Sequence, residues 1–147
     1  MSEAQLSLTN DQLLSTTRAV RKRLDFERDV PMSTIKECMD LAVQAPSGSN
    51  AQGWQFVFVT DQEKKQKIGE YYREAFSHYR HMPFAIHKLH SDSADASLAN
   101  SQERSASSAD YLADNMGKAP VLMIPCIAGR IDNAEGANAS AQAGTMG

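Results

Sequence analysis

The spacing of apolar side chains predicts three helices within residues 9–79 of the chain. The first covers residues 9–20, has a thin apolar side and is capped by Thr9 or Asn10. The second begins at Ser33, its expected N-cap, and its apolar residues recur three and four positions apart. Those residues are Ile35, Cys38, Met39, Ala42 and Val43. The third follows a capping box formed by Thr60 and Glu63.

The third helix has a mixed pattern that predicts one buried and one solvated side. The expected buried residues are Ile68, Tyr71, Tyr72, Ala75, Phe76 and Tyr79. The expected solvated residues are Lys64, Lys65, Lys67 and Glu70.

Two short segments, residues 54–60 and 121–127, have the aromatic and β-branched content of strands. Apolar residues at successive positions of the first segment indicate a strand covered on both faces. Between them, residues 80–108 lack periodicity, which favours a lid or a mobile excursion, and a fourth helix is expected over 108–116, ended by Gly117. Because a two-stranded sheet is not stable alone, further strands must come from elsewhere in the protein or from a second subunit.

Composition narrows the class of protein. The 147 residues, with 41% hydrophobic residues and a net charge of −3, suit one globular domain over residues 1–147. No apolar run approaches the about 20 residues that span a bilayer, and the polar start does not resemble a signal peptide. Two cysteines, Cys38 and Cys126, are expected to be buried thiols. We therefore expect a cytoplasmic protein that binds neither membranes nor, given its charge, nucleic acid.

A basic segment interrupts this acidic chain: Arg18, Arg21, Lys22 and Arg23 place four cations within six residues. Arginine offers paired donors that match phosphate, so the segment is a candidate anion site. The alternative is a solvated basic turn whose charges pair with the acidic residues that follow it. Those residues are Asp25, Glu27 and Asp29.

A second candidate is the segment Ala45-Pro46-Ser47-Gly48-Ser49-Asn50-Ala51-Gln52-Gly53-Trp54. Its hydroxyls, amides and indole can hydrogen-bond a planar polar ring, and Gly48 and Gly53 would allow a close approach to the backbone. The alternative is an ordinary loop between a helix and a strand.

Taken together and in this order, the two segments resemble the start of the nitroreductase family of FMN-dependent oxidoreductases. The segments Arg18-Ala19-Val20-Arg21 and 45–56 carry the resemblance, with the helix between them. Ala19 stands where the family often has Ser, and Gly53 where it often has Pro. The resemblance implies an α+β fold with a mixed sheet flanked by helices, which is incomplete in this chain.

The resemblance also implies a cofactor, a reaction and a set of site residues. Arg18, Ala19 and Arg21 would hold the FMN phosphate and the edge of the flavin ring. The ring would be contacted by Pro46, Ser47 and Gly48, with Asn50 and Gln52 nearby. Bound flavin would carry a hydride from NAD(P)H to a nitroaromatic or quinone-like small molecule, so no catalytic side chain is expected.

Four histidines, His78, His81, His87 and His90, lie within thirteen residues. They are expected to be lid or surface residues and not metal ligands, because no cysteine lies near them. In the family this region covers the flavin, so the residues expected to line the acceptor pocket are Tyr79, His81, Met82 and Phe84.

Two other functions stay open at this stage. One is a non-redox protein of the same fold that binds or modifies flavin. The other is an inactive fragment that acts at most as an interaction module, since relatives are longer interlocked homodimers and this chain stops at 143–147, where a dimer helix would begin. The sequence therefore predicts the N-terminal part of a homodimeric enzyme.

Overall fold

A computed structural model describes residues 7–89 and 93–127 and contains helices around a small sheet. The elements are α1 (Asn10–Thr16), α2 (Met32–Ala42), the 3-10 turn η1 (Gly48–Asn50), β1 (Trp54–Val59), α3 (Gln62–Tyr79), α4 (Ala96–Asn115), the 3-10 turn η2 (Met116–Lys118) and β2 (Leu122–Ile127). The predicted α+β class is confirmed. The expected helix near residues 143–147 lies outside the described residues.

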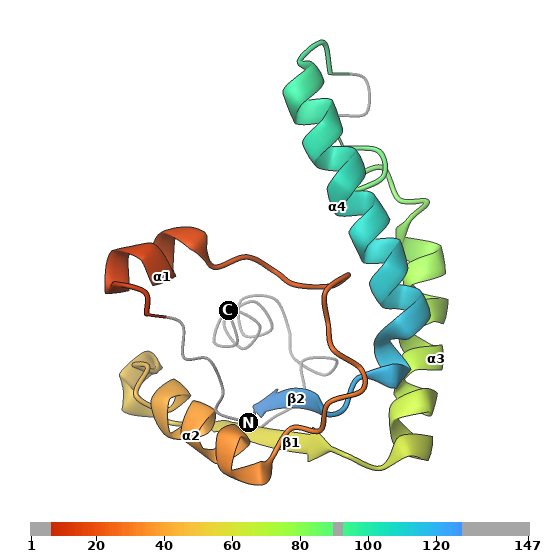
Figure 1. Ribbon diagram of the computed structural model, residues 1–147. Coiled ribbons are helices and arrows are strands. Elements are labelled where there is room, and N and C mark those ends of the chain that lie inside the picture. Colours follow the sequence, from red (N-terminus) through yellow and green to blue (C-terminus); the bar gives the residue numbers. More distant parts are fainter. Residues whose placement is uncertain (1–6, 90–92, 128–147) are drawn as a thin grey trace.

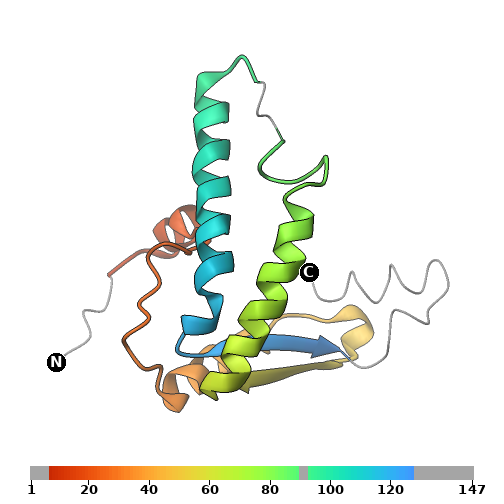
Figure 2. The ribbon, with the colours of Figure 1, turned by 90° about the vertical axis from the view of Figure 1, so that its right-hand side faces the viewer.

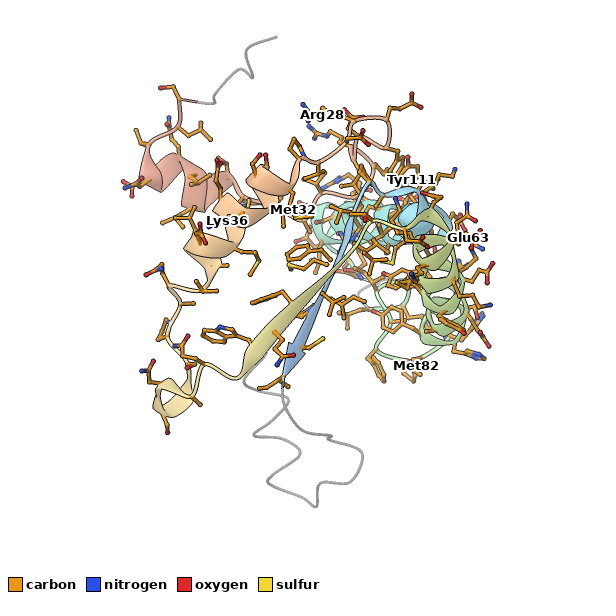
Figure 3. The ribbon with its side chains drawn as sticks, turned by 90° about the horizontal axis from the view of Figure 1, so that it is seen from below. Arg28, Met32, Lys36, Glu63, Met82 and Tyr111 are labelled. Atoms are coloured by element: carbon orange, nitrogen blue, oxygen red, sulfur yellow. The ribbon has the colours of Figure 1, made fainter. Side chains whose placement is uncertain are left out.

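The helices form two groups on opposite sides of the sheet. In Figure 1, α1 and α2 lie on one side of the molecule, and α3 and α4 lie on the other. Figure 2 shows α3 and α4 rising side by side from the sheet, consistent with their direct packing. Seen from below in Figure 3, the sheet runs between α2, marked by Met32 and Lys36, and α3, marked by Glu63.

The two strands pair antiparallel, with Trp54 opposite Ile127 and Val59 opposite Leu122. Trp54, Phe56 and Phe58 alternate toward the half-buried side of β1. The expectation that both faces are covered is wrong for the described chain, because Val57 on the other face is 49% exposed. The sequence shows that a side chain is apolar, but it does not show whether other residues of the same chain pack against it.

The tightest packing joins α3 to η2. A Cβ added to Gly69 would lie 2.9 Å from the backbone nitrogen of Gly117, so two backbones meet where neither residue has a side chain. Lys65, one turn earlier on α3, is only 5% exposed, and its Nζ donates to the carbonyl oxygens of Ala119 and Pro120 at 2.8 and 3.0 Å. These contacts fix the start of α3 against the entry to β2.

This packing shows that the prediction of buried and exposed residues on α3 is partly wrong. Lys65 faces the protein and not solvent, whereas Tyr71 is exposed. The helix presents a narrow side to η2, and a glycine with a lysine one turn before it fits there better than a ring. The aromatic residues Tyr72, Phe76 and Tyr79 are half-buried on a neighbouring side.

Capping residues predict three helix starts, and one of them is confirmed. Thr9 caps α1 through a capping box with Gln12, although α1 ends at Thr16, four residues before the predicted end at 20. The N-cap of α2 is Pro31 and not Ser33, which lies inside the helix. Asp61, and not Thr60, caps α3 by accepting from the backbone N–H of Lys64. A carboxylate next to the predicted hydroxyl is an equally good cap.

Helix α4 begins at Ala96, capped by Asp95, so residues 96–108 are helical and not irregular as predicted. Its buried residues are Ala106, Ala109 and Ala113. They repeat at helical spacing, but they are too small to give a clear apolar pattern beside the surrounding serines. Whether the turn from Arg80 to Leu89 acts as a lid stays a prediction.

Large apolar side chains of α1 and α2 are exposed. Leu14 is 79% exposed, and Leu41 is 76% exposed. Of the apolar residues predicted to form the inner side of α2, only Ile35 is buried. Cys38 is exposed and Cys126 is half-buried, so the expectation of two buried thiols is wrong. Among the helices that the structure describes, none is long and apolar enough to cross a membrane.

Candidate functional site

The basic segment lines a hollow of about 680 Å³ between the end of α1 and α4. Its lining residues are Thr16, Arg18, Ala19, Val20, Arg21, Lys22, Arg23 and Ser108. All four cations of the segment and Ala19 are therefore brought to one surface. Residues 17–31 run from α1 across to α4 and return to α2, which is why this segment faces α4 (Figure 1).

The charges of this segment are not neutralised by the acidic residues that follow it. Across residues 7–89 and 93–127, no ion pair joins Arg18, Arg21, Lys22 or Arg23 to a carboxylate. Asp25 instead pairs with Arg28 at 3.5 Å and accepts from the backbone N–H of Glu27. The solvated basic turn with internal pairing is thus not formed in the described chain, and the four basic residues line the hollow without a carboxylate partner.

Two serines of α4 hold the basic segment in place. Lys22 Nζ donates to Ser107 Oγ at 2.7 Å, and Arg21 Nη1 donates to Ser108 Oγ at 3.4 Å. Further along, the ring of Phe26 stacks near Tyr111 with centroids 6.4 Å apart. The sequence does not indicate Ser107 and Ser108 as partners, because they lie more than 80 positions from the basic segment.

A second hollow, of about 350 Å³, lies beside the first and shares Arg21 with it. Its other lining residues are Tyr72, Ala75, Phe76, Tyr79, Ile86 and Ala109. The Tyr79 hydroxyl accepts from the backbone N–H of Ile86 at 3.0 Å, which fixes the chain after α3 against the helix. One predicted cofactor residue and one predicted acceptor-pocket residue, Arg21 and Tyr79, therefore border the same space.

The remaining predicted acceptor-pocket residues are not gathered there. Phe84 lies near Tyr79, with ring centroids 6.4 Å apart, but it is 65% exposed. His81 and Met82 are also exposed and line neither hollow. The structure thus supports only Tyr79 of that set as a lining residue, and Tyr72, Phe76 and Ile86 are the neighbours that the prediction omitted.

The loop before β1 has its own hydrogen-bond network. Ser47 Oγ accepts from the backbone N–H of Gln52 at 2.9 Å and from Gln52 Nε2 at 3.2 Å. Gln52 Nε2 also donates to Asn50 Oδ1 at 2.9 Å. Ser47, a predicted ring contact, is thereby joined to Asn50 and Gln52, which were predicted to lie nearby, and Pro46 and Gly48 are neighbours of Ser47 in the chain.

The backbone of this loop is strained at residues other than glycine. Ser49, Asn50 and Gln52 have φ values of 53°, 53° and 48°, in the left-handed region that residues with a side chain rarely adopt. Gly48 does not use that region, and a Cβ added to it would meet nothing within 4 Å among the described residues. The fold itself therefore does not require a glycine at position 48.

Among the described residues, no side-chain hydrogen bond joins the basic segment to this loop. Within the described part of the chain, the side-chain bonds of the basic segment run to α1, to α4 or within the segment, whereas those of the loop stay inside the loop. The two segments predicted to bind the cofactor are thus each held by their own hydrogen bonds, and among the described residues no side-chain hydrogen bond joins one to the other.

His87 is the histidine with a defined partner. Its Nε2 lies 2.9 Å from Asp110 Oδ1, and Arg80 Nη2 lies 3.6 Å from the same oxygen. Because a carboxylate only accepts, Nε2 carries the proton and Nδ1, which is buried, has no partner in the described structure. No group of three metal-binding side chains occurs among the described residues. His90 lies outside them.

The clear pKa shifts lie on the outer side of α3, away from both hollows. The hydrogen bond from Lys67, and then its charge, lower the pKa of Glu70 below its ordinary value. The same bond raises the pKa of Lys67. Both groups are exposed, so solvent screens this pair and it says little about the site.

Comparison with known proteins agrees with the resemblance in the sequence. A protein of Stenotrophomonas maltophilia (strain K279a), named for NADH dehydrogenase and NAD(P)H nitroreductase activity, is 38% identical over 68 residues, which are 46% of this chain and 34% of that protein. The match thus spans about a third of the relative's length. No solved structure matches the chain. The profile of the Nitroreductase family matches residues 14–146, nearly the whole sequence, and the chain belongs to the nitroreductase family.

Proposed function

We propose that this chain is part of an FMN-dependent oxidoreductase that passes a hydride from NAD(P)H to a nitroaromatic or quinone-like acceptor. The observation that carries the proposal is the hollow lined by four cations with no carboxylate partner among the described residues. In a nitroreductase-family chain, such a site suits the phosphate of a flavin nucleotide. The relative's name supports the same class of reaction.

The residues present fit FMN. Arg18 and Arg21 would bind its phosphate, because guanidinium groups offer paired donors, and Ala19 leaves the backbone beside them accessible. The loop of Pro46, Ser47, Gly48, Asn50 and Gln52 would contact the ring. Strained backbone often marks a ligand contact, and the open space beside Gly48 leaves room for one.

Bound FMN would supply the hydride and electron transfer between NAD(P)H and the acceptor, which is why no protein side chain is proposed as catalytic. The chain's own residues bind and orient. The cations fix the phosphate, the Ser47–Gln52 cluster holds the loop in one conformation, and Tyr79 forms part of the wall of the acceptor pocket. His81, Met82 and Phe84 stay predictions as pocket residues.

The assembly that we propose is a homodimer in the cytoplasm. Exposed apolar residues on α1 and α2 support a subunit interface, because large exposed apolar patches mark contact surfaces. A second subunit could also bring further groups to the two halves of the site, which no side-chain hydrogen bond joins within the described chain.

The test is an FMN titration followed by flavin fluorescence. Arg21→Ala should weaken FMN binding about 10- to 100-fold, because a bond to a charged group contributes about 1.5–3 kcal/mol. Lys64→Ala on the exposed first turn of α3 is the matched control and should bind FMN as the unchanged chain does. Equal losses in the two variants would refute the phosphate role.

A second measurement separates this proposal from the alternatives. The purified protein should be yellow, and NAD(P)H should bleach its flavin absorbance. Sustained NAD(P)H oxidation with an added nitroarene would rule out a non-redox flavin protein. A colourless chain that ignores added FMN would favour the inactive fragment.

A further inference from the structure

The hollow between α3 and α4 combines aromatic walls with one cation. Tyr72 and Phe76 stack with centroids 6.1 Å apart, and Phe76 and Tyr79 are 5.8 Å apart. These rings follow one another along α3, and Ala109 of α4 closes the space between the helices. Because the Tyr79 hydroxyl is already bonded to the backbone of Ile86, this wall presents ring surface more than a free polar group.

The cation is Arg21, and its charge is not compensated by the described chain. One of its terminal nitrogens donates to Ser108 Oγ at 3.4 Å, and no carboxylate forms an ion pair with it in the described ranges. A guanidinium has five N–H donors, so most of them stay available. Arg21 borders both hollows and can therefore serve an anion in the aromatic hollow as well as a phosphate in the basic one.

We propose that this hollow binds a planar aromatic molecule that carries an anionic group, with the ring against Tyr72, Phe76 and Tyr79 and the anion on Arg21. The inference rests on the proposed function, because it takes this ligand to be the electron acceptor. An anionic nitroarene is then expected to be a better acceptor than a neutral one. Aromatic rings stack well on these side chains. An anionic group on the ligand would accept charge-assisted hydrogen bonds from the remaining N–H donors of Arg21.

The volume sets the size of this ligand. At about 350 Å³ the hollow is at the lower end of small-molecule sites, which suits one substituted ring better than a fused polycycle.

Calorimetric titration of the full chain in buffer with saturating FMN tests the proposal. The probes are 4-nitrobenzoate and 4-nitrobenzamide, which share shape and nitro group but differ in charge. We expect 4-nitrobenzoate to bind about tenfold more tightly or better, the gain expected for a bond to a charged partner. Equal binding of the acid and the amide would overturn the proposal.

A cavity-filling variant tests the location. Ala75→Leu adds a larger side chain at an exposed position that lines the hollow, and it should weaken 4-nitrobenzoate binding about tenfold while leaving FMN binding unchanged. Ala96→Leu, at the exposed start of α4, is the matched control and should bind both as the unchanged chain does. Unchanged 4-nitrobenzoate binding in a folded Ala75→Leu variant would contradict the assignment.

Competition distinguishes the two hollows. If 4-nitrobenzoate displaced FMN, the anion would lie in the basic hollow and the proposal would be wrong. None of these titrations contains a reductant. Missing NAD(P)H oxidation would therefore contradict the proposed function alone, whereas the binding results decide the ligand class.

Discussion

At the scale of single residues, the loop before β1 places its strain and its glycine at different positions. Ser49, Asn50 and Gln52 adopt left-handed backbone, although none of them is glycine. Gly48 is conformationally ordinary and faces open space. Neither the backbone nor the packing of the described chain requires glycine there, which agrees with the ligand contact that we propose at position 48.

This reasoning predicts the effect of Gly48→Ala. The substitution should leave the free energy of unfolding unchanged or raise it by up to about 1 kcal/mol, because it restricts the unfolded chain without a clash. It should weaken FMN binding about tenfold or more, since the methyl group enters the ligand's space. Thermal unfolding and flavin fluorescence measure the two effects. Normal FMN affinity in this variant would remove Gly48 from the site.

Sequence could predict some residues of the site but not their neighbours. The arginines and the Ser47 loop could be proposed as site residues because a resemblance depends on local order in the chain, and the structure places Arg18, Ala19 and Arg21 on one hollow. Ser107 and Ser108 were missed because their contacts span more than 80 positions. Lys65 was misplaced because a lysine in a polar run is normally solvated, and only the carbonyl groups of a distant turn explain its burial.

At the scale of elements, the contact between α3 and η2 depends on two glycines. A methyl group on Gly69 would lie 2.9 Å from the backbone nitrogen and 3.1 Å from the Cα of Gly117. A Cβ on Gly117 would in turn lie 3.1 Å from the Cα of Gln66. Backbone on both sides cannot rotate away, so the helix would have to move.

Gly69→Ala should therefore destabilise the protein. Alanine gains about 1 kcal/mol over glycine within a helix, but overpacking costs about 1–3 kcal/mol. We expect the free energy of unfolding to fall by up to about 2 kcal/mol, measured by urea denaturation. Gly48→Ala is the matched control, with the same change at an open position. A Gly69→Ala variant more stable than the unchanged chain would contradict the close approach.

The bounds of a helix or strand can be predicted from the sequence where large apolar side chains are concentrated in it. Both strands and α3 fall close to their predicted ranges because aromatic and β-branched residues are concentrated there. Helix α4 was predicted only at its end, since its buried side is made of alanine, and small residues give a weak periodic pattern among serines. The cap of α3 shifted by one residue because Thr60 and Asp61 are both good caps.

At the scale of the whole molecule, the described chain leaves much apolar surface in solvent. No large side chain is fully buried among residues 7–89 and 93–127. Leu41 and Met32 on α2 and Leu14 on α1 are mostly exposed. Such surface favours association, in agreement with the homodimer that we propose. The sequence indicates that the sheet has too few strands, but it does not indicate which apolar surfaces are exposed to solvent.

A charge in this surface should weaken the dimer. Leu41→Glu is expected to raise the dimer dissociation constant about tenfold or more, because burying a carboxylate in an apolar interface is costly. Light scattering after size exclusion would show the mass shift from dimer toward monomer. Gln44→Glu, just after α2, adds the same charge at a polar position and should have little effect. Identical masses for both variants would place the interface elsewhere.

The close approach at Gly69 and Gly117 has a consequence for how this fold can vary. It locks α3 and the end of α4 together next to the sheet, at the far end from the turn that joins the two helices. Residues can therefore be added just before Asp95, outside the contacts that Ile86 and His87 make with α3 and α4, without changing the register of β2 against β1. An affinity tag or a fluorophore inserted near Ala94, before the cap of α4, should be accepted without disturbing either strand, which makes this end of the helical pair a practical attachment point.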